Sequence, residues 1–70
     1  MLDNTAPLVS IAVISYNSEK TIIDTLESIK DQTYKNIELI ISDDFSSDNT
    51  LSIAKTWISN NKSRFVNTII

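Results

Sequence analysis

The chain has 70 residues, a net charge of −3 and neither cysteine nor histidine. A chain of this size forms one small domain or part of a larger one, and without those two residue types it has no disulfide framework and no Cys/His zinc site. The acidic balance argues against nucleic-acid binding, which needs a basic face to displace counterions from phosphates. The longest apolar run, at residues 8–14, is far shorter than the ~20 residues of a membrane span.

Glycine is also absent, although it averages about 7% of globular sequences. Its absence excludes three glycine-dependent motifs, namely the Walker loop, the G-x-G-x-x-G fingerprint and the G-x-S-x-G elbow. Turns that need a positive φ must therefore use Asn, Asp or Ser, which tolerate that conformation with some strain.

The first half of the chain predicts a strand followed by a helix. Residues 1–6 form a leader without the apolar region of a signal peptide. Val9–Ile14 is almost entirely apolar and rich in β-branched residues, which predicts a strand buried on both faces, as in a parallel sheet. Asn17 or Ser18 is expected to cap a helix over Glu19–Lys30. The apolar residues of that helix recur at helical spacing, at Ile22, Ile23, Leu26 and Ile29.

The second half repeats this pattern and ends in a third strand. Ile37–Ile41 is predicted to be the second strand, and a helix is predicted over Asp48–Asn60, capped by Ser47 or Asp48. Arg64–Ile70 is predicted to be the third strand. The second helix has a wide apolar arc, formed by Leu51, Ile53, Ala54, Trp57 and Ile58.

Two features suggest that residues 1–70 are the N-terminal part of a larger domain. The chain stops at Ile70 inside an apolar run, with no closing helix. Trp57 is expected in a core or an interface. Because the apolar arc is wider than one sheet face needs, Trp57 or Ile53 is expected to be covered only by a further segment. We expect the 70 residues alone to be unstable or to associate, because exposed strand edges and apolar patches promote pairing.

The predicted order β-α-β-α-β defines the fold class as α/β. Alternation of this kind implies a parallel sheet with right-handed crossovers, here in the strand order 3-2-1. Ligands of such sheets bind beyond the carboxyl ends of the strands. Polar clusters at residues 15–18 and 42–48 fall there, and strands ~4.8 Å apart should bring both clusters to one crevice.

The acids of the second cluster suit the nucleoside end of a nucleotide. A carboxylate accepts hydrogen bonds from ribose hydroxyls or from a base N–H. Asp43, Asp44 and Asp48 together repel phosphate, and neither a lysine nor a glycine nest lies nearby to offset them. Alternatives remain open at this point: Asp48 is assigned mainly to helix capping, Asp43 and Asp44 are a candidate metal pair, and Tyr16 alone is commonly a packing residue.

The sequence resembles the family 2 glycosyltransferases of the GT-A type. Pro7–Asn17 (PLVSIAVISYN) resembles the opening strand of that family. Ser28–Asp48 (SIKDQTYKNIELIISDDFSSD) follows the family block S-I-x-x-Q-T-Y-x-N-x-E-h-I-h-h-D-D-G-S-x-D, where h is hydrophobic. Each piece alone is a weak signal, but their order and spacing together are specific, and they extend to about Trp57.

The resemblance implies a partial Rossmann-like, nucleotide-binding half and assigns residues to it. Ile14, Ser15 and Tyr16 correspond to the segment that holds the base, with Tyr16 at the aromatic position. Asp43 corresponds to the acid that hydrogen-bonds the base. Asp44 and Asp48 correspond to acids that shape the loop beside the nucleotide.

The resemblance also implies an activity for the parent enzyme. Such enzymes move a sugar from a nucleotide diphosphate-sugar, here expected to be UDP-linked, to an acceptor hydroxyl. A carboxylate base deprotonates the acceptor and a divalent metal, Mg²⁺ or Mn²⁺, stabilises the leaving diphosphate. The family's D-x-D metal motif and catalytic base lie beyond these 70 residues, so the chain alone is expected to be inactive. A cytoplasmic location is expected, with any membrane association supplied by other segments.

One departure from the family and two rival functions complete the prediction. The family usually has glycine where this chain has Phe45, and because a positive φ would strain a phenylalanine, another backbone form for this loop is an open alternative. A dinucleotide-dependent oxidoreductase also places an acid after its second strand, but the missing glycines argue against it. A non-catalytic fragment that binds a nucleotide or a partner is the other alternative.

Overall fold

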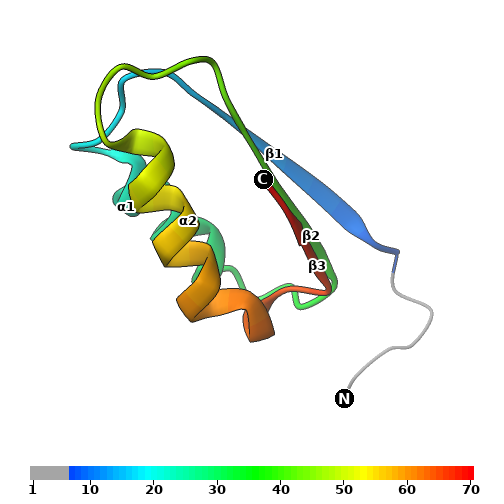
Figure 1. Ribbon diagram of the computed structural model, residues 1–70. Helices are drawn as coiled ribbons and strands as arrows, with labels where there is room; N and C mark the ends of the chain where they lie inside the picture. The colour runs from blue at the N-terminus through cyan, green and yellow to red at the C-terminus, as the bar shows by residue number, and fades with distance from the viewer. Residues whose placement is uncertain (1–6) are drawn as a thin grey trace.

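The computed structural model describes residues 7–70, so the predicted leader at 1–6 lies outside the described residues (Figure 1). Its elements alternate as predicted: β1 (Val9–Ser15), α1 (Ile22–Lys30), β2 (Ile37–Asp43), α2 (Thr50–Asn61), the short 3-10 helix η1 (Lys62–Arg64) and β3 (Asn67–Ile69). All strand pairs are parallel, and the order β1-β2-β3 is the predicted order 3-2-1 read from the other edge. The chain therefore forms the expected α/β sheet.

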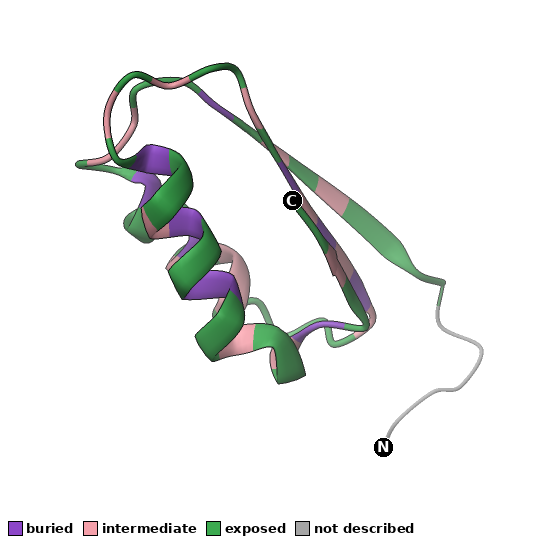
Figure 2. Cartoon of the chain, in the orientation of Figure 1, coloured by how far each residue is buried: buried purple, intermediate pink, exposed green. Residues whose placement is uncertain are grey.

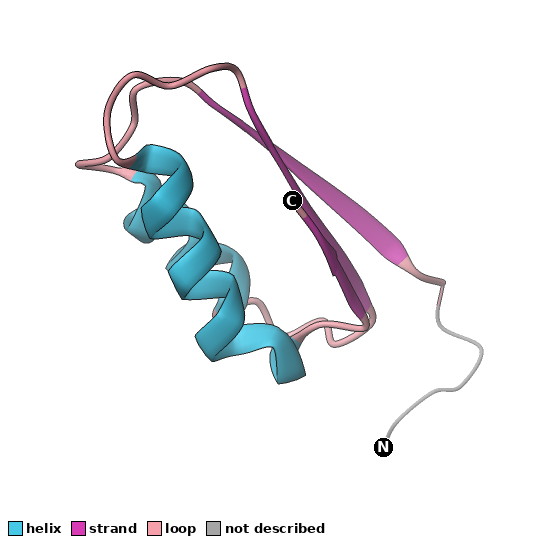
Figure 3. Cartoon of the chain, viewed as in Figure 1, coloured by secondary structure: helices cyan, strands magenta, loops and turns pink. Residues whose placement is uncertain are grey.

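The core lies between the sheet and the two helices, which pack on the same face of it (Figures 1 and 3). Alternate residues of a strand point to one face, and in β2 these are Ile37, Leu39 and Ile41, each at most 3% exposed. Leu26 of α1 is fully buried against them, and Trp57 of α2 is 6% exposed. The predicted helical stripe of α1 is thus confirmed as core at Ile22 and Leu26, although Ile23 is 38% exposed.

The prediction that β1 is buried on both faces is wrong for this chain (Figure 2). Ile11 and Val13 pack against the core, whereas Ile14 is 79% exposed. The physical reason is the crossover handedness: two successive right-handed connections that move the same way along the sheet place both helices on one face. Within residues 7–70, no helix covers the other face.

The uncovered face carries a polar row across all three strands. Ser10, Glu38 and Asn67 are aligned by the strand register. The Ser10 hydroxyl donates to Glu38 Oε1 at 2.8 Å, and Asn67 Nδ2 donates to Glu38 Oε2 at 2.9 Å. These bonds, that from Asn67 first, lower the pKa of the Glu38 carboxyl below its ordinary value.

Both helices begin later than predicted. Residues 19–21 form a turn, and α1 starts at Ile22 with Thr21 as N-cap. The Ser18 carbonyl, not a side chain, accepts the N–H groups of Thr21 and Ile22 at 3.0 and 2.8 Å. The predicted caps at Asn17 and Ser18 are therefore wrong.

The second helix begins at Thr50, and its N-cap Asn49 makes no side-chain capping bond. Asp48, one residue earlier, instead accepts the Thr50 N–H at 2.9 Å. Asp48 therefore accepts an N–H group of the first helical turn, as predicted, but it does so from the position before the N-cap. Ser47, the predicted alternative, is not the cap.

The third strand is shorter than the predicted Arg64–Ile70. It covers only Asn67–Ile69, because Arg64 lies in η1 and bonds to the end of α1. Arg64 Nε donates to the Lys30 carbonyl at 2.8 Å, and its Nη2 donates to the carbonyls of Gln32 and Tyr34 at 2.9 and 3.0 Å. One guanidinium thereby holds the last residue of α1 and the loop that leads into β2.

Trp57 is a core residue, as one of its two predicted placements required, and Ile53 is partly buried against the same core. Its ring lies 6.0 Å from that of Phe65, centroid to centroid. Its Nε1 donates to Glu27 Oε2 at 2.7 Å, which contributes most to lowering the pKa of the Glu27 carboxyl. Within residues 7–70, neither helix combines the length and apolar character that a membrane crossing requires.

Candidate functional site

The carboxyl ends of β1 and β2 bring the two predicted polar clusters together. Ser15 pairs with Asp43 in the parallel register, and the Ser15 hydroxyl donates to Asp43 Oδ1 at 2.7 Å. The Asp44 N–H then donates to the Ser15 carbonyl at 2.8 Å, which extends the pairing past the strand ends. The loops 16–21 and 44–49 therefore leave the sheet side by side, and Figure 1 shows both at the same end of the molecule.

Asp43 is held by three donors from the chain itself. Its Oδ1 accepts from the hydroxyls of Ser15 and Ser46, the latter at 2.6 Å, and its Oδ2 accepts the Ser46 N–H at 2.9 Å. These bonds, led by the Ser46 hydroxyl, lower the pKa of the Asp43 carboxyl below its ordinary 3.8. The carboxylate is thus ionised at neutral pH and fixed in one orientation, with free acceptor capacity mainly on Oδ2.

The two loops are also joined through Asn17. Its N–H donates to Ser46 Oγ at 2.9 Å, and its side-chain Oδ1 accepts the Ser47 N–H at 2.8 Å. This geometry depends on a left-handed backbone, because Asn17 has φ of 46°. The prediction that an Asn would replace glycine at a positive φ is correct here.

Phe45 also has a positive φ, at 52°, so the prediction that only Asn, Asp or Ser would take this conformation is wrong here. The loop therefore keeps the left-handed position at which the resembled family has glycine, and the alternative backbone form is not adopted. The side chain of Phe45 is 95% exposed, so no burial compensates for the strain of this conformation.

A second set of bonds ties the start of α2 to the first loop. Asp48 Oδ1 accepts from the N–H and the hydroxyl of Thr50, and its Oδ2 accepts the Glu19 N–H at 3.2 Å. Thr50 Oγ1 accepts the Ser18 N–H at 2.7 Å, and Glu19 Oε1 accepts the Asn49 N–H at 2.9 Å. Desolvation raises the pKa of the Asp48 carboxyl, but the hydrogen bonds from Thr50 and Glu19 outweigh it and the net pKa is lowered.

The other predicted site residues differ in exposure. Ser15 is 3% exposed and lies beneath Asp43, whereas Tyr16 is 60% exposed and Asp44 is also at the surface. Ile14 is exposed on the uncovered sheet face. Ser42 also points to that face, because its strand position alternates with that of the buried Ile41. The predicted site residues therefore divide into exposed ones and the buried Ser15, which hydrogen-bonds Asp43.

Three residues that hold this site were missed as such by sequence reasoning: Asn17, Ser46 and Thr50. Asn17 and Ser46 were visible in the polar clusters, but their cross-loop partners depend on the parallel register, which sequence spacing does not supply. Thr50 is fully buried. Its role could not be recognised from the sequence, because threonine is common at helix starts. The absence of glycine was the one usable signal, since it pointed to Asn at a positive φ.

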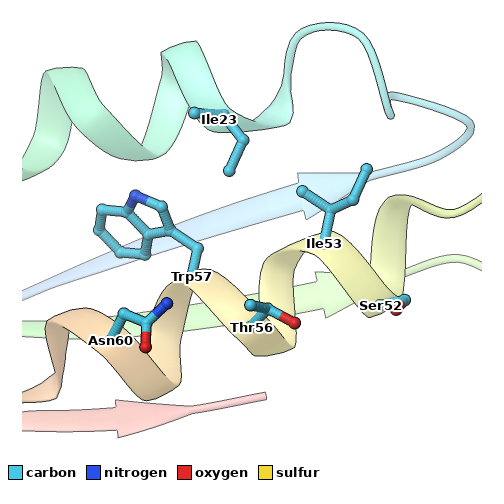
Figure 4. Close-up of a pocket in the computed structure, with 6 residues that line it drawn as sticks. All are labelled: Ile23, Ser52, Ile53, Thr56, Trp57 and Asn60. Atoms are coloured by element: carbon cyan, nitrogen blue, oxygen red, sulfur yellow. The ribbon is translucent and has the colours of Figure 1, made fainter.

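A groove between the two helices lies outside this site. A shallow groove of about 320 Å³ lies between α1 and α2 (Figure 4), lined by Ile23, Ser52, Ile53, Thr56, Trp57 and Asn60. None of the predicted site residues lines it. Among residues 7–70, no cluster of three or more His, Cys, Asp or Glu side chains could hold a metal ion.

Asp43 and Asp44 do not fit the metal-pair alternative. Both oxygens of Asp43 already accept protein donors, and Asp44 offers only one further exposed carboxylate. A divalent cation such as Mg²⁺ needs several oxygen ligands around it. Asp43 and Asp44 alone therefore do not supply the ligands of a metal site.

The chain forms a parallel α/β half-sheet with acids at the carboxyl ends of its strands, and comparison with known proteins identifies the family. The sequence model of glycosyl transferase family 2 matches residues 10–68. The chain therefore belongs to glycosyl transferase family 2.

Three relatives illustrate how the chain compares with known members. It is 56% identical over 46 residues to the Escherichia coli protein named UDP-Glc:alpha-D-GlcNAc-diphosphoundecaprenol beta-1,3-glucosyltransferase WfaP, a match that covers 66% of this chain and 18% of the relative. The similarly named WfgD of Escherichia coli is 56% identical over 43 residues, covering 61% and 17%. Glycosyltransferase GlyG of Streptococcus pneumoniae is 41% identical over 51 residues, covering 73% and 17%. The chain thus spans less than a fifth of the length of these relatives.

Proposed function

We propose that the whole protein transfers a sugar from a nucleotide diphosphate-sugar to an acceptor hydroxyl, and that the loops 16–21 and 44–49 hold the nucleoside of the donor. The observation that carries this proposal is the contact between Ser15 and Asp43 at the carboxyl ends of adjacent parallel strands. That edge is where open α/β sheets bind their ligands. Family membership supports the reaction class.

Within this site Asp43 binds the base. Its carboxylate is ionised and oriented, and the remaining acceptor capacity of Oδ2 suits an N–H of the base, since charge-assisted bonds of this kind are short and strong. Tyr16 is exposed beside it and offers a ring for stacking on the base. Ser15 supports Asp43 from below, Ile14 supplies backbone at the same strand end, and Asp44 shapes the outer loop.

A uracil base is the expected partner of this carboxylate. Uracil carries a ring N–H, which can donate to Oδ2. Two relatives have names that specify UDP-Glc as donor, which supports a UDP-linked sugar for this protein as well. The pyrophosphate end requires Mg²⁺ or Mn²⁺ ligated by residues outside this chain, because the acids here repel phosphate and do not form a metal site.

Calorimetric titration of the whole protein with UDP tests the proposal. Asp43→Asn keeps the size of the side chain but removes its charge, and it is expected to weaken UDP binding by about tenfold or more, the scale for a lost hydrogen bond to a charged group. Asp48→Asn is the matched control. It retains an acceptor for the Thr50 N–H and should change the affinity far less.

Equal losses from the two substitutions would mean that the site is misassigned. Release of UDP from a UDP-sugar in the presence of Mn²⁺ tests the reaction class separately. A whole protein that binds UDP through Asp43 but never releases UDP from any UDP-sugar would support nucleotide binding and overturn the proposed transfer.

A further inference from the structure

Ser46 contacts both oxygens of the Asp43 carboxylate. Its hydroxyl donates to Oδ1 at 2.6 Å and its N–H donates to Oδ2 at 2.9 Å. Ser15, the other donor to this carboxylate within residues 7–70, makes one hydrogen bond to it. A carboxylate gripped at both oxygens cannot rotate about its terminal bond without breaking one of them.

The Ser46 hydroxyl is itself oriented from the first loop. Its oxygen accepts the Asn17 N–H at 2.9 Å, which leaves its single proton free to point at Asp43. Asn17 is fixed in turn, because its side-chain Oδ1 accepts the Ser47 N–H at 2.8 Å. A directed chain of hydrogen bonds therefore runs from Asn17 through Ser46 to Asp43 and joins the two loops.

We propose that Ser46 is a positioning residue for the nucleotide, acting through Asp43, and that Asn17 controls the orientation of Ser46 from the opposite loop. The inference rests on the proposed role of Asp43 as the acceptor for the base. Ser46 donates to Oδ1 and leaves acceptor capacity on Oδ2 turned toward the ligand. A base N–H then meets an acceptor that is already oriented, which spares the ordering that binding would otherwise require.

The two loops also carry the charged residues Glu19, Lys20, Asp44 and Asp48. Of these, Asp48 already interacts with Asp43 through repulsion between the two carboxylates. Removing the Ser46 hydroxyl leaves these charges in place. It removes the hydrogen bond that contributes most to lowering the pKa of Asp43. The Asp43 titration therefore reports on Ser46 separately from ligand binding.

The test uses the whole protein with Ser46→Ala, and with Ser42→Ala as the matched control. Ser42 is the residue before Asp43, but its side chain lies on the uncovered sheet face. Two quantities are measured: the UDP dissociation constant by calorimetry at neutral pH, and the Asp43 pKa from the pH dependence of its carboxyl ¹³C resonance. We expect Ser46→Ala to raise the Asp43 pKa, because the largest cause of its lowering is removed, and to weaken UDP binding about three- to tenfold, as for one lost bond to a charged acceptor.

Two further variants distinguish positioning from general loop damage. Ser46→Thr retains a hydroxyl and should restore both the pKa and the affinity. Asn17→Gly keeps the positive φ and the N–H donor to Ser46 but removes the grip on Ser47. It should weaken UDP binding less than Ser46→Ala does. If Ser46→Ala fails to fold, the UDP affinity of Asn17→Gly is measured in its place.

The outcomes separate this inference from the proposed function. If Asp43→Asn weakens UDP binding but Ser46→Ala leaves both the pKa and the affinity unchanged, Ser46 has no positioning role and the inference is overturned. If Ser46→Ala does not fold and Asn17→Gly binds UDP like the unmodified protein, it is overturned as well. If Asp43→Asn itself has no effect, the proposed function fails first.

Discussion

The two edges of the sheet are held together by different chemistry. At the carboxyl edge, partly buried polar side chains join two loops, with Asp43 and Asp48 as the central acceptors. At the amino edge, Trp57 and Phe65 pack in the core and Arg64 ties η1 to α1. The contrast teaches that the candidate binding groups lie at the end that is joined by hydrogen bonds between loops, and that the packed aromatic rings lie at the other. Substitutions at the two ends should therefore differ in kind.

The largest expected effect on stability is at the amino edge, for Trp57→Ala. Trp57 is buried between both helices and contacts Phe65, so its removal leaves a cavity and should lower the free energy of unfolding by about 3–5 kcal/mol. Lys55→Ala, an exposed site on the same helix, should change it by less than about 0.5 kcal/mol. Chemical denaturation of the whole protein measures both. Similar losses at the two sites would show that α2 is not anchored through Trp57.

A smaller loss is expected for Arg64→Lys. A lysine carries the charge but not the planar fork that reaches three carbonyls, and one or two hydrogen bonds should be lost, about 1–2 kcal/mol. Lys62→Ala in the same 3-10 turn is exposed and is the control. Denaturation midpoints compare them. If Arg64→Lys were as stable as the unmodified protein, the contacts at the end of α1 would contribute nothing measurable.

Acid should loosen the hydrogen bonds that join the two loops at the carboxyl edge. The pKa values of Asp43 and Asp48 are lowered in the folded chain, so their stabilising contribution is complete above their ordinary value of 3.8 and is lost as the pH falls through the lowered folded values. Hydrogen-exchange protection factors of the Ser46 and Thr50 amides, which donate to these carboxylates, should fall in that range.

The control for the acid experiment is the Val66 amide, which donates to the Ile37 carbonyl at 2.8 Å. Its acceptor does not titrate, so its protection should persist until the whole fold opens. Loss of protection at Val66 and Ser46 at the same pH would indicate one global transition and would remove the distinction between the two edges.

The difference between the edges also explains which features the sequence could predict. Apolar periodicity was sufficient for β1, α1, β2 and α2, because the buried residues Leu26, Leu39 and Ala54 follow strand or helix spacing. The meeting of the polar clusters at residues 15–18 and 42–48 followed from parallel topology, but the register that pairs Ser15 with Asp43 did not. The helix starts and the third strand were placed wrongly because Asn17, Asp48 and Arg64 bond to partners about 30 residues away. Local capping rules do not contain such contacts.

The smallest expected effect separates the two left-handed residues of the carboxyl edge. Phe45 has a φ of 52° and a side chain that is 95% exposed, so Phe45→Gly removes backbone strain and loses little packing. The strain relief is partly offset because glycine has more freedom in the unfolded chain. A net gain of about 0.5–1 kcal/mol in the free energy of unfolding is expected.

Asn17→Gly is the informative partner of that change. It also relieves a left-handed backbone, but it removes the acceptor for the Ser47 N–H, so stability should stay level or fall by up to about 1 kcal/mol. Thermal unfolding of the two variants in parallel measures the difference. A gain for Phe45→Gly without one for Asn17→Gly identifies Asn17 as a residue kept for its cross-loop bond. Equal gains would mean that this bond adds no stability and that the two loops are joined mainly through Asp48 and Thr50.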